Sequence, residues 1–179
     1  TFPEGRCALA VPLFEDGAGG DSLLLEEGDV KAIMRLRENG AVRGKPQEVY
    51  FLPSASDAYD GVALLGLGKR DACTTELVRR AAGKACESLG AHRIARVVFD
   101  AVPLAEHAHG FVEGVMLGQY RFDRYKEQKP GEPAPKAVEE ITVSLDNATQ
   151  GVTARCERAR IVCESANWAR DLANTPAND

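Results

Sequence analysis

The heptapeptide Gly61-Val62-Ala63-Leu64-Leu65-Gly66-Leu67 is apolar at every position. A strand with one face in water alternates apolar and polar residues, whereas a strand covered by helices on both faces does not. The run is also short, which favours a strand over a buried helix. It therefore predicts a layered fold in which helices cover both sides of this strand.

Segments on either side of this run alternate between strand and helix patterns. That order predicts an α/β fold of three layers, with a mainly parallel or mixed sheet and helices on both faces. Pro12 places the first strand at a sheet edge or marks the end of that strand, because proline cannot donate to a ladder. The other predicted strands are residues 7–14, 48–52, 94–99 and 137–145. The predicted helices run from an Asp29 N-cap to Asn39-Gly40, from a Thr74 or Thr75 cap to Gly90, over 104–120 and over 149–173.

The last predicted helix has an unusual pattern of side chains. A stripe of mostly small residues suggests a close approach of this helix to the sheet, with Ile161, Trp168 and Leu172 beside it as bulk. Thr175 precedes Pro176 and is therefore expected outside the helix. The stripe is formed by Val152, Cys156, Ala159, Cys163, Ala166 and Ala173.

Composition sets limits on the function. The 179 residues carry a net charge of −5, which argues against general nucleic-acid binding. The five cysteines are odd in number and form no Cys-x-x-Cys pair, so we expect reduced thiols. No apolar run is long enough for a transmembrane helix, and the first residues lack the features of a secretory signal. We expect a cytoplasmic protein, and the missing initiator methionine suggests a trimmed N-terminus.

The turn Gly66-Leu67-Gly68-Lys69 follows the buried strand and almost opens a helix. Backbone N–H groups at such a turn can hold a phosphate. The turn lacks the third glycine of the dinucleotide fingerprint and the Gly-Lys-Ser/Thr of a P-loop. We favour a structural turn, in which glycine permits a tight exit from the sheet.

Histidines and cysteines give no convincing site. His107 and His109 point in different directions on a helix, and His109 with Glu113 supplies only two ligands. Cys73 lies near a predicted helix N-terminus, where a thiol pKa is lowered, but a packing role is favoured. Glu106 and His92 do not add the ligands that a metal site would need. We favour the interpretation that the histidines and these carboxylates are solvated surface residues.

One basic stretch is compatible with a nucleic-acid contact. Tyr120–Lys126 mixes aromatics with Arg121 and Arg124, which suits stacking and phosphate pairing, but it is too short for a basic stripe. A helix end held by its aromatics is favoured instead. On the last helix, Arg155, Arg158, Arg160 and Arg170 alternate with acids, which is typical of a solvated face or of an interdomain or subunit surface.

Three segments together resemble the leucine (cytosol) aminopeptidase family, over essentially the whole chain. They are Leu65–Lys69, Gly118–Lys126 and Trp168–Pro176 with Asn178-Asp179. The resemblance implies a macro-domain-like N-terminal α/β domain at residues 1–148. It also implies a long helix and linker, residues 149–179, toward a C-terminal catalytic domain outside this chain. Family members are cytoplasmic homo-hexamers that remove N-terminal residues, often leucine, from peptides with two divalent metals (Zn, Mn or Mg).

The family's Asn-Thr-Asp-Ala-Glu-Gly-Arg signature is absent from residues 1–179. We therefore carry over no catalytic, cofactor-binding or metal-binding residue, and we expect this segment alone to be inactive and to hold no cofactor. Its expected role is to pack on the catalytic domain and to support assembly and the active-site surroundings. Two alternatives remain open: a macro-like module that binds ADP-ribose or phosphate at Gly66–Gly68, and a nucleic-acid-binding domain.

Overall fold

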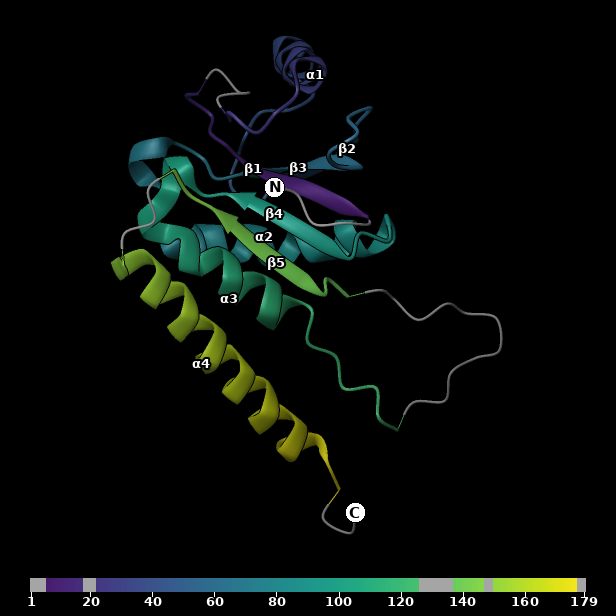
Figure 1. The fold of residues 1–179 in the computed structure, drawn as a ribbon, viewed down its shortest axis with the longest axis vertical. Coiled ribbons are helices and arrows are strands. Elements are labelled where there is room, and N and C mark those ends of the chain that lie inside the picture. Colours follow the sequence, from purple (N-terminus) through teal and green to yellow (C-terminus); the bar gives the residue numbers. More distant parts are fainter. Residues whose placement is uncertain (1–5, 18–21, 126–136, 147–149, 177–179) are drawn as a thin grey trace.

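A computed structural model describes residues 6–17, 22–125, 137–146 and 150–176 of the chain. One five-stranded sheet has the order β2-β3-β1-β4-β5 and lies between helices (Figure 1). The strands are β1 (Cys7–Leu13), β2 (Val49–Pro53), β3 (Gly61–Gly66), β4 (Arg96–Asp100) and β5 (Glu140–Ser144). The α-helices are α1 (Glu27–Glu38), α2 (Thr75–Ala91), α3 (Ala108–Gly118) and α4 (Gln150–Asn174), with short 3₁₀ helices η1 (Arg70–Ala72) and η2 (Val102–His107).

The sheet is mixed, and its four consecutive strands β3, β1, β4 and β5 are parallel. Only β2 runs antiparallel, against β3. β1 lies at the centre, so Pro12 marks a strand end and not a sheet edge. Pro12 is tolerated there because the pairing of β1 with β4 has already ended at Ala10, while the pairing with β3 continues to Leu13.

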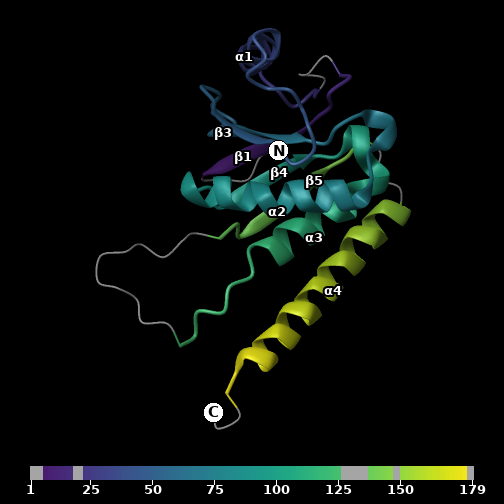
Figure 2. The ribbon, with the colours of Figure 1, turned by 180° about the vertical axis from the view of Figure 1, so that it is seen from behind.

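Helices cover both faces of the sheet, as predicted. On one face, Ile33 of α1 packs on a cluster that includes Leu9 of β1 and Leu64 of β3. On the other face, α2 and α3 pack on the alternate residues of these strands, such as Ala63 of β3, and on Phe99 of β4 (Figures 1 and 2). Every residue of β1 and of β3 is buried, which explains the continuous apolar run at Gly61–Leu67.

Three helix boundaries differ from the prediction. Helix α1 begins at Glu27, and Asp29 lies inside it, where its carboxylate accepts hydrogen bonds from Ser54 (2.6 Å) and Tyr59 (2.8 Å). Helix α2 has the predicted Thr74 cap but continues through Gly90, because the chain reverses only at Arg93, which has a φ of 56°. The segment 104–120 begins as the 3₁₀ helix η2, since Leu104 has non-helical angles.

The prediction for the last helix holds only at its start. Helix α4 packs mainly on α3, as the third helix on that side (Figure 2), while Val152 and Cys156 join the core cluster that includes Ile141 and Val143 of β5. Its buried residues are Val152, Ala159 and Cys163. Trp168 and Leu172, expected to supply bulk, are 65% and 56% exposed. Thr175 lies beyond the helix end, as predicted.

Helices α2 and α3 approach each other through residues without side chains. A Cβ atom at Gly118 would lie 2.7 Å from the Cα of Gly83, and one at Gly114 would lie 2.7 Å from the Ala82 Cβ. These distances are shorter than any real carbon contact, so the two backbones are nearly touching. Because α3 covers the sheet beside α2, this contact positions both helices of the layer.

All five cysteines have free thiols, and Cys7 and Cys163 are buried. Burial raises the pKa of the Cys7 thiol to about 11, and the Asp60 and Glu140 carboxylates act in the same direction. The segment 126–136, predicted as a surface loop, lies outside the described residues. None of the helices in the described ranges combines the length and the hydropathy needed to cross a membrane.

We expect Gly114→Ala to destabilise the fold by about 2–3 kcal/mol, because the new methyl group overlaps the carbonyl oxygen of Arg79. Gly28→Ala in α1 is the matched control. Nothing lies within 4 Å of its new Cβ, so it should change stability by less than ~1 kcal/mol, and in the favourable direction. Urea unfolding of both variants measures the difference. Equal effects of the two substitutions would contradict a close backbone contact.

We expect stability to fall at alkaline pH because of Cys7. A thiol with a raised pKa in the folded state keeps its proton there while the unfolded chain loses it. Its contribution is therefore complete below pH 9.0 and is lost as the pH rises toward about 11. Cys7→Ser should flatten the dependence of the unfolding free energy on pH over that range, and Cys156→Ser, at a half-buried position, should flatten it less. An unchanged slope in Cys7→Ser would contradict this assignment.

Candidate functional site

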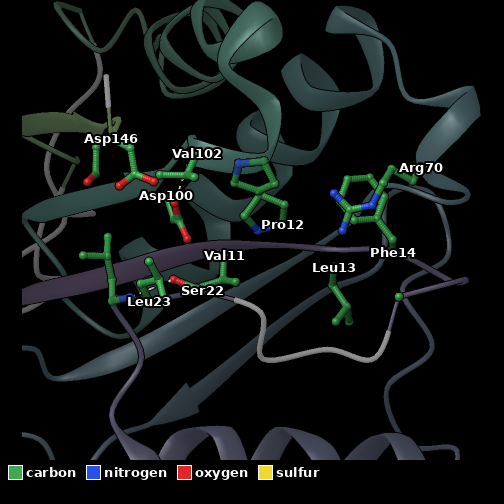
Figure 3. A pocket seen from close by; sticks show the side chains of 14 residues that line it. Val11, Pro12, Leu13, Phe14, Ser22, Leu23, Arg70, Asp100, Val102 and Asp146 are labelled. Atoms are coloured by element: carbon green, nitrogen blue, oxygen red, sulfur yellow. Dashed lines mark hydrogen bonds between the residues drawn. The ribbon is translucent and has the colours of Figure 1, made fainter. Parts of the chain in front are cut away.

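A cavity of about 110 Å³ lies at the edge of the sheet where the parallel strands end (Figure 3). The carboxyl ends of three strands form it: Leu13 ends β1 and Phe14 follows it, Asp100 ends β4, and Asp146 follows β5. The volume is several times the ~10–15 Å³ that a single water molecule needs. The cavity therefore has room for a group of several heavy atoms.

The topology of the sheet explains why the cavity is at this place. After β1 the chain passes to α1 on one face, whereas after β4 it passes to α3 on the opposite face. Loops that leave neighbouring strands in opposite directions separate, and open α/β sheets bind ligands in the resulting crevice. β1 and β4 are neighbours in this sheet, and the cavity lies at their carboxyl ends.

Asp100 is the most unusual residue in the lining. It is only 2% exposed and is the one polar residue buried to this degree in the described part of the chain. The backbone N–H of Val102 donates to its Oδ1 at 3.1 Å, which fixes the side chain. Figure 3 shows its carboxylate directed into the cavity, on the same side as Asp146. Ser144 of β5 also lines this acidic end.

Phe14 and Arg70 form the other end of the cavity (Figure 3). The guanidinium of Arg70 lies 4.3 Å from the centre of the Phe14 ring, within the range of a cation–π contact. The backbone N–H of Arg70 donates to Asp16 Oδ1 at 3.1 Å, so η1 is tied to the loop after β1. Between the two ends the lining is apolar, and it includes Val11, Val102 and Pro103.

The turn Gly66–Gly68 does not line this cavity. Its backbone N–H groups already donate within the protein: Gly66 to Glu48 O, Leu67 to Leu13 O and Gly68 to Gly44 O. A Cβ at Gly66 would overlap the carbonyl oxygen of Lys45, and Gly68 has a φ of +78°. Glycine is therefore explained by backbone geometry, and no donor remains at these three positions for a phosphate.

The structure does not bring the histidines together as metal ligands. His107 Nδ1 lies 2.9 Å from the Thr75 hydroxyl, and Glu113 accepts a hydrogen bond from Arg79 at 2.7 Å. Nδ1 of His109 is buried without a hydrogen-bond partner, and burial lowers the pKa of this imidazole. His92 stacks on Phe51. The described ranges contain no group of three or more His, Cys, Asp or Glu side chains placed to hold a metal ion.

Burial also determines the direction in which the pKa of the Cys73 thiol is shifted. Cys73 directly precedes the Thr74 cap of α2, the position at which a helix lowers a thiol pKa. Desolvation is the larger effect, and the pKa of Cys73 is raised. A raised pKa disfavours the thiolate, so the residue lacks the property that a nucleophilic cysteine requires.

The aromatic segment after α3 is attached to the end of α4. Tyr120 donates to Asp171 at 2.9 Å, and the guanidinium of Arg170 lies 5.2 Å from its ring centre. On the same helix Arg160 pairs with Glu157 and Glu164, and these two carboxylates raise its pKa. These contacts match the structural interpretation of both basic stretches; Lys126 lies outside the described residues.

Sequence reasoning missed the residues of the cavity. Asp100 and Asp146 each follow an apolar run that was correctly predicted as a strand. A polar residue at the carboxyl end of a parallel strand is a recognisable signal, because ligands bind at that edge. This signal does not identify the cavity by itself, because only the strand order places β1, β4 and β5 beside one another.

Comparisons with known proteins agree on one family. The model of the cytosol aminopeptidase family, N-terminal domain, matches residues 10–129. A probable cytosol aminopeptidase of Clostridium perfringens is 31% identical over 96% of this chain, and one of Geobacter sulfurreducens is 33% identical over 96%. The matches cover 35% and 36% of those proteins, so the chain spans about a third of their length.

Solved structures are similar over nearly the whole chain. The bottromycin maturation enzyme BotP in complex with Mn has a TM-score of 0.67 at 26% identity, over 96% of this chain and 32% of its own. A variant of tomato leucine aminopeptidase has a TM-score of 0.72 at 18% identity, over 98% of this chain and 37% of its own. The second similarity supports the fold alone. Together with the family model and the curated relatives, these findings show that the chain belongs to the cytosol aminopeptidase family, as its N-terminal domain.

Proposed function

We propose that this chain is the non-catalytic N-terminal part of a metal-dependent aminopeptidase that removes N-terminal residues such as leucine from peptides in the cytoplasm. The family match over residues 10–129 carries the proposal. Related proteins are about three times as long as this chain, which leaves room for a catalytic domain. The proposed partners are that domain and, through it, further copies in a homo-hexamer.

The chemistry of the described residues supports a non-catalytic role. A dinuclear site needs several carboxylates that converge on ions ~3.5–4 Å apart. The described ranges hold no cluster of that kind, and Asp100 and Asp146 supply only two acidic side chains at the cavity. The residues present therefore do not fit the pair of divalent metals (Zn, Mn or Mg) expected for the parent enzyme. We place that metal pair in the catalytic domain.

Helix α4 supports the proposed contact with a catalytic domain. Its outer face exposes Ile161 and Val162 by half or more, and Trp168 and Leu172 further along. Large apolar side chains gathered on one helix are typical of an interaction surface. Because α3 covers the opposite face of α4, this outer face is available to the catalytic domain.

The two alternative functions receive less support. A phosphate or an ADP-ribose diphosphate at Gly66–Gly68 has no free backbone donors to bind, since all three N–H groups are engaged. The net charge of −5 disfavours nucleic acid, and Arg160 of α4 is engaged by Glu157 and Glu164. Calorimetric titration with ADP-ribose and a gel-shift assay at low salt test these alternatives.

We expect the 179-residue chain with manganese to leave a leucine anilide unhydrolysed, because the described residues contain no metal cluster. The same chain extended through the reading frame of its gene should hydrolyse the substrate. The extension should contain the Asn-Thr-Asp-Ala-Glu-Gly-Arg signature. Metal-dependent turnover by the 179-residue chain alone would place the chemistry inside it and refute the proposal.

We expect Trp168→Ser to lower the stability of the extended protein more than it lowers the stability of the isolated chain. Burying a large apolar side chain contributes ~1.5–3 kcal/mol, and Trp168 gains that burial only when the catalytic domain covers α4. Met34→Ser, at an exposed position of α1, is the matched control. Thermal unfolding and light scattering of both variants, with and without the extension, measure stability and assembly. If Trp168→Ser lowers stability by the same amount with and without the extension, α4 does not contact the extension.

A further inference from the structure

The acidic end of the cavity has an unbalanced charge. Asp100 is 2% exposed, and among the described residues its carboxylate has one hydrogen bond, from Val102 N–H to Oδ1. A buried carboxylate is costly unless a cation or several donors face it. Asp146, also in the lining, adds a second negative charge instead of compensating the first. The arrangement is therefore incomplete in electrostatic terms.

The missing group is better explained by an organic cation than by a metal ion. Calcium takes six to eight oxygen ligands, and magnesium requires six in octahedral geometry. The lining offers two carboxylates and the hydroxyls of Ser22 and Ser144, so water molecules would have to supply the remaining ligands beside a largely apolar wall. A primary ammonium group satisfies Asp100 with one charged hydrogen bond and has two further N–H groups for neighbouring oxygens.

The remaining lining indicates what the ammonium group is attached to. Val11, Leu13, Val102 and Pro103 provide an apolar wall next to the carboxylates. Such a wall favours a short hydrocarbon body. The volume of about 110 Å³ restricts the ligand to a small molecule.

We propose that the cavity between the carboxyl ends of β1, β4 and β5 binds a small primary amine, with its ammonium group on Asp100 and its apolar body against Val11 and Val102. The described residues that line the site all belong to this chain, and the proposed binding does not depend on the proposed peptidase activity. Its ligand is either a free amino acid or an alkyl amine that lacks the carboxylate. Both present the same ammonium group to Asp100.

Nuclear magnetic resonance titration of the 179-residue chain tests the proposal with three probes. They are isoamylamine, L-leucine, and isoamyl alcohol, which has the same hydrocarbon body without the ammonium. We expect isoamylamine at millimolar concentration to shift the backbone signals of Val11, Val102 and Ser144, and isoamyl alcohol to leave them in place. Binding of leucine as well identifies free amino acids as the source, and binding of isoamylamine alone identifies decarboxylated amines.

Asp100→Asn provides the variant test. Its amide oxygen still accepts from Val102 N–H, so the loop keeps its conformation, while the charge that binds ammonium is lost. We expect amine binding about tenfold weaker or more. Asp57→Asn makes the same change at an exposed position before β3, at the opposite edge of the sheet, and should bind as the unaltered chain does.

Several results would overturn the proposal. They are the absence of shifts with both amines, shifts confined to residues outside the cavity, equal binding of the alcohol, or equal binding by Asp100→Asn and Asp57→Asn. The titration of the unaltered chain decides the matter even if Asp100→Asn fails to fold. None of these results bears on the peptidase assignment, which is tested by hydrolysis in the extended protein.

Discussion

The near contact of two helix backbones is the constraint on which this fold depends. At Gly83, Gly114 and Gly118, α2 and α3 have no side chains between them, and a methyl group at Gly114 or Gly118 would meet backbone or Cβ atoms of α2 at 2.7 Å or less. Two helices at this distance act as one layer, and together they cover the apolar face of the central strands. Their position then determines where the chain enters β4 and β5, and so where the strand ends meet.

The sequence predicted the layers well because the patterns that define them are local. The continuous apolar run at Gly61–Leu67 indicates burial on both faces without reference to any other part of the chain. The errors occurred where a distant contact overrides a local preference. Asp29 resembles an N-cap, but Ser54 and Tyr59 recruit its carboxylate inside the helix. Gly90 resembles a helix stop, but the reversal occurs at Arg93.

The candidate site was beyond sequence reasoning for a different reason. Each of its acidic residues was visible as a polar residue after a strand, yet Asp100 and Asp146 are separated by a helix and a strand in the chain. Their proximity follows from the strand order, which periodicity does not encode. The glycine turn was visible because its residues are consecutive, but the structure uses its N–H groups to join β3 to neighbouring segments. The glycine turn is therefore easier to recognise in the sequence than the cavity is, but it says less about where a ligand could bind.

Helix α4 shows how one element can be partly stabilised by its own domain. Val152, Ala159 and Cys163 bury one narrow stripe against α3, and the last three turns are held mainly by polar contacts such as Tyr120 with Asp171. Exposed polar pairs contribute at most ~1 kcal/mol each, whereas Trp168 and Leu172 remain largely in water. A helix of 25 residues with so little of its surface buried gains little from its own domain. Its length and exposed apolar residues are more simply explained if the other side of α4 is stabilised by a second domain, so that the helix is a shared wall between two cores.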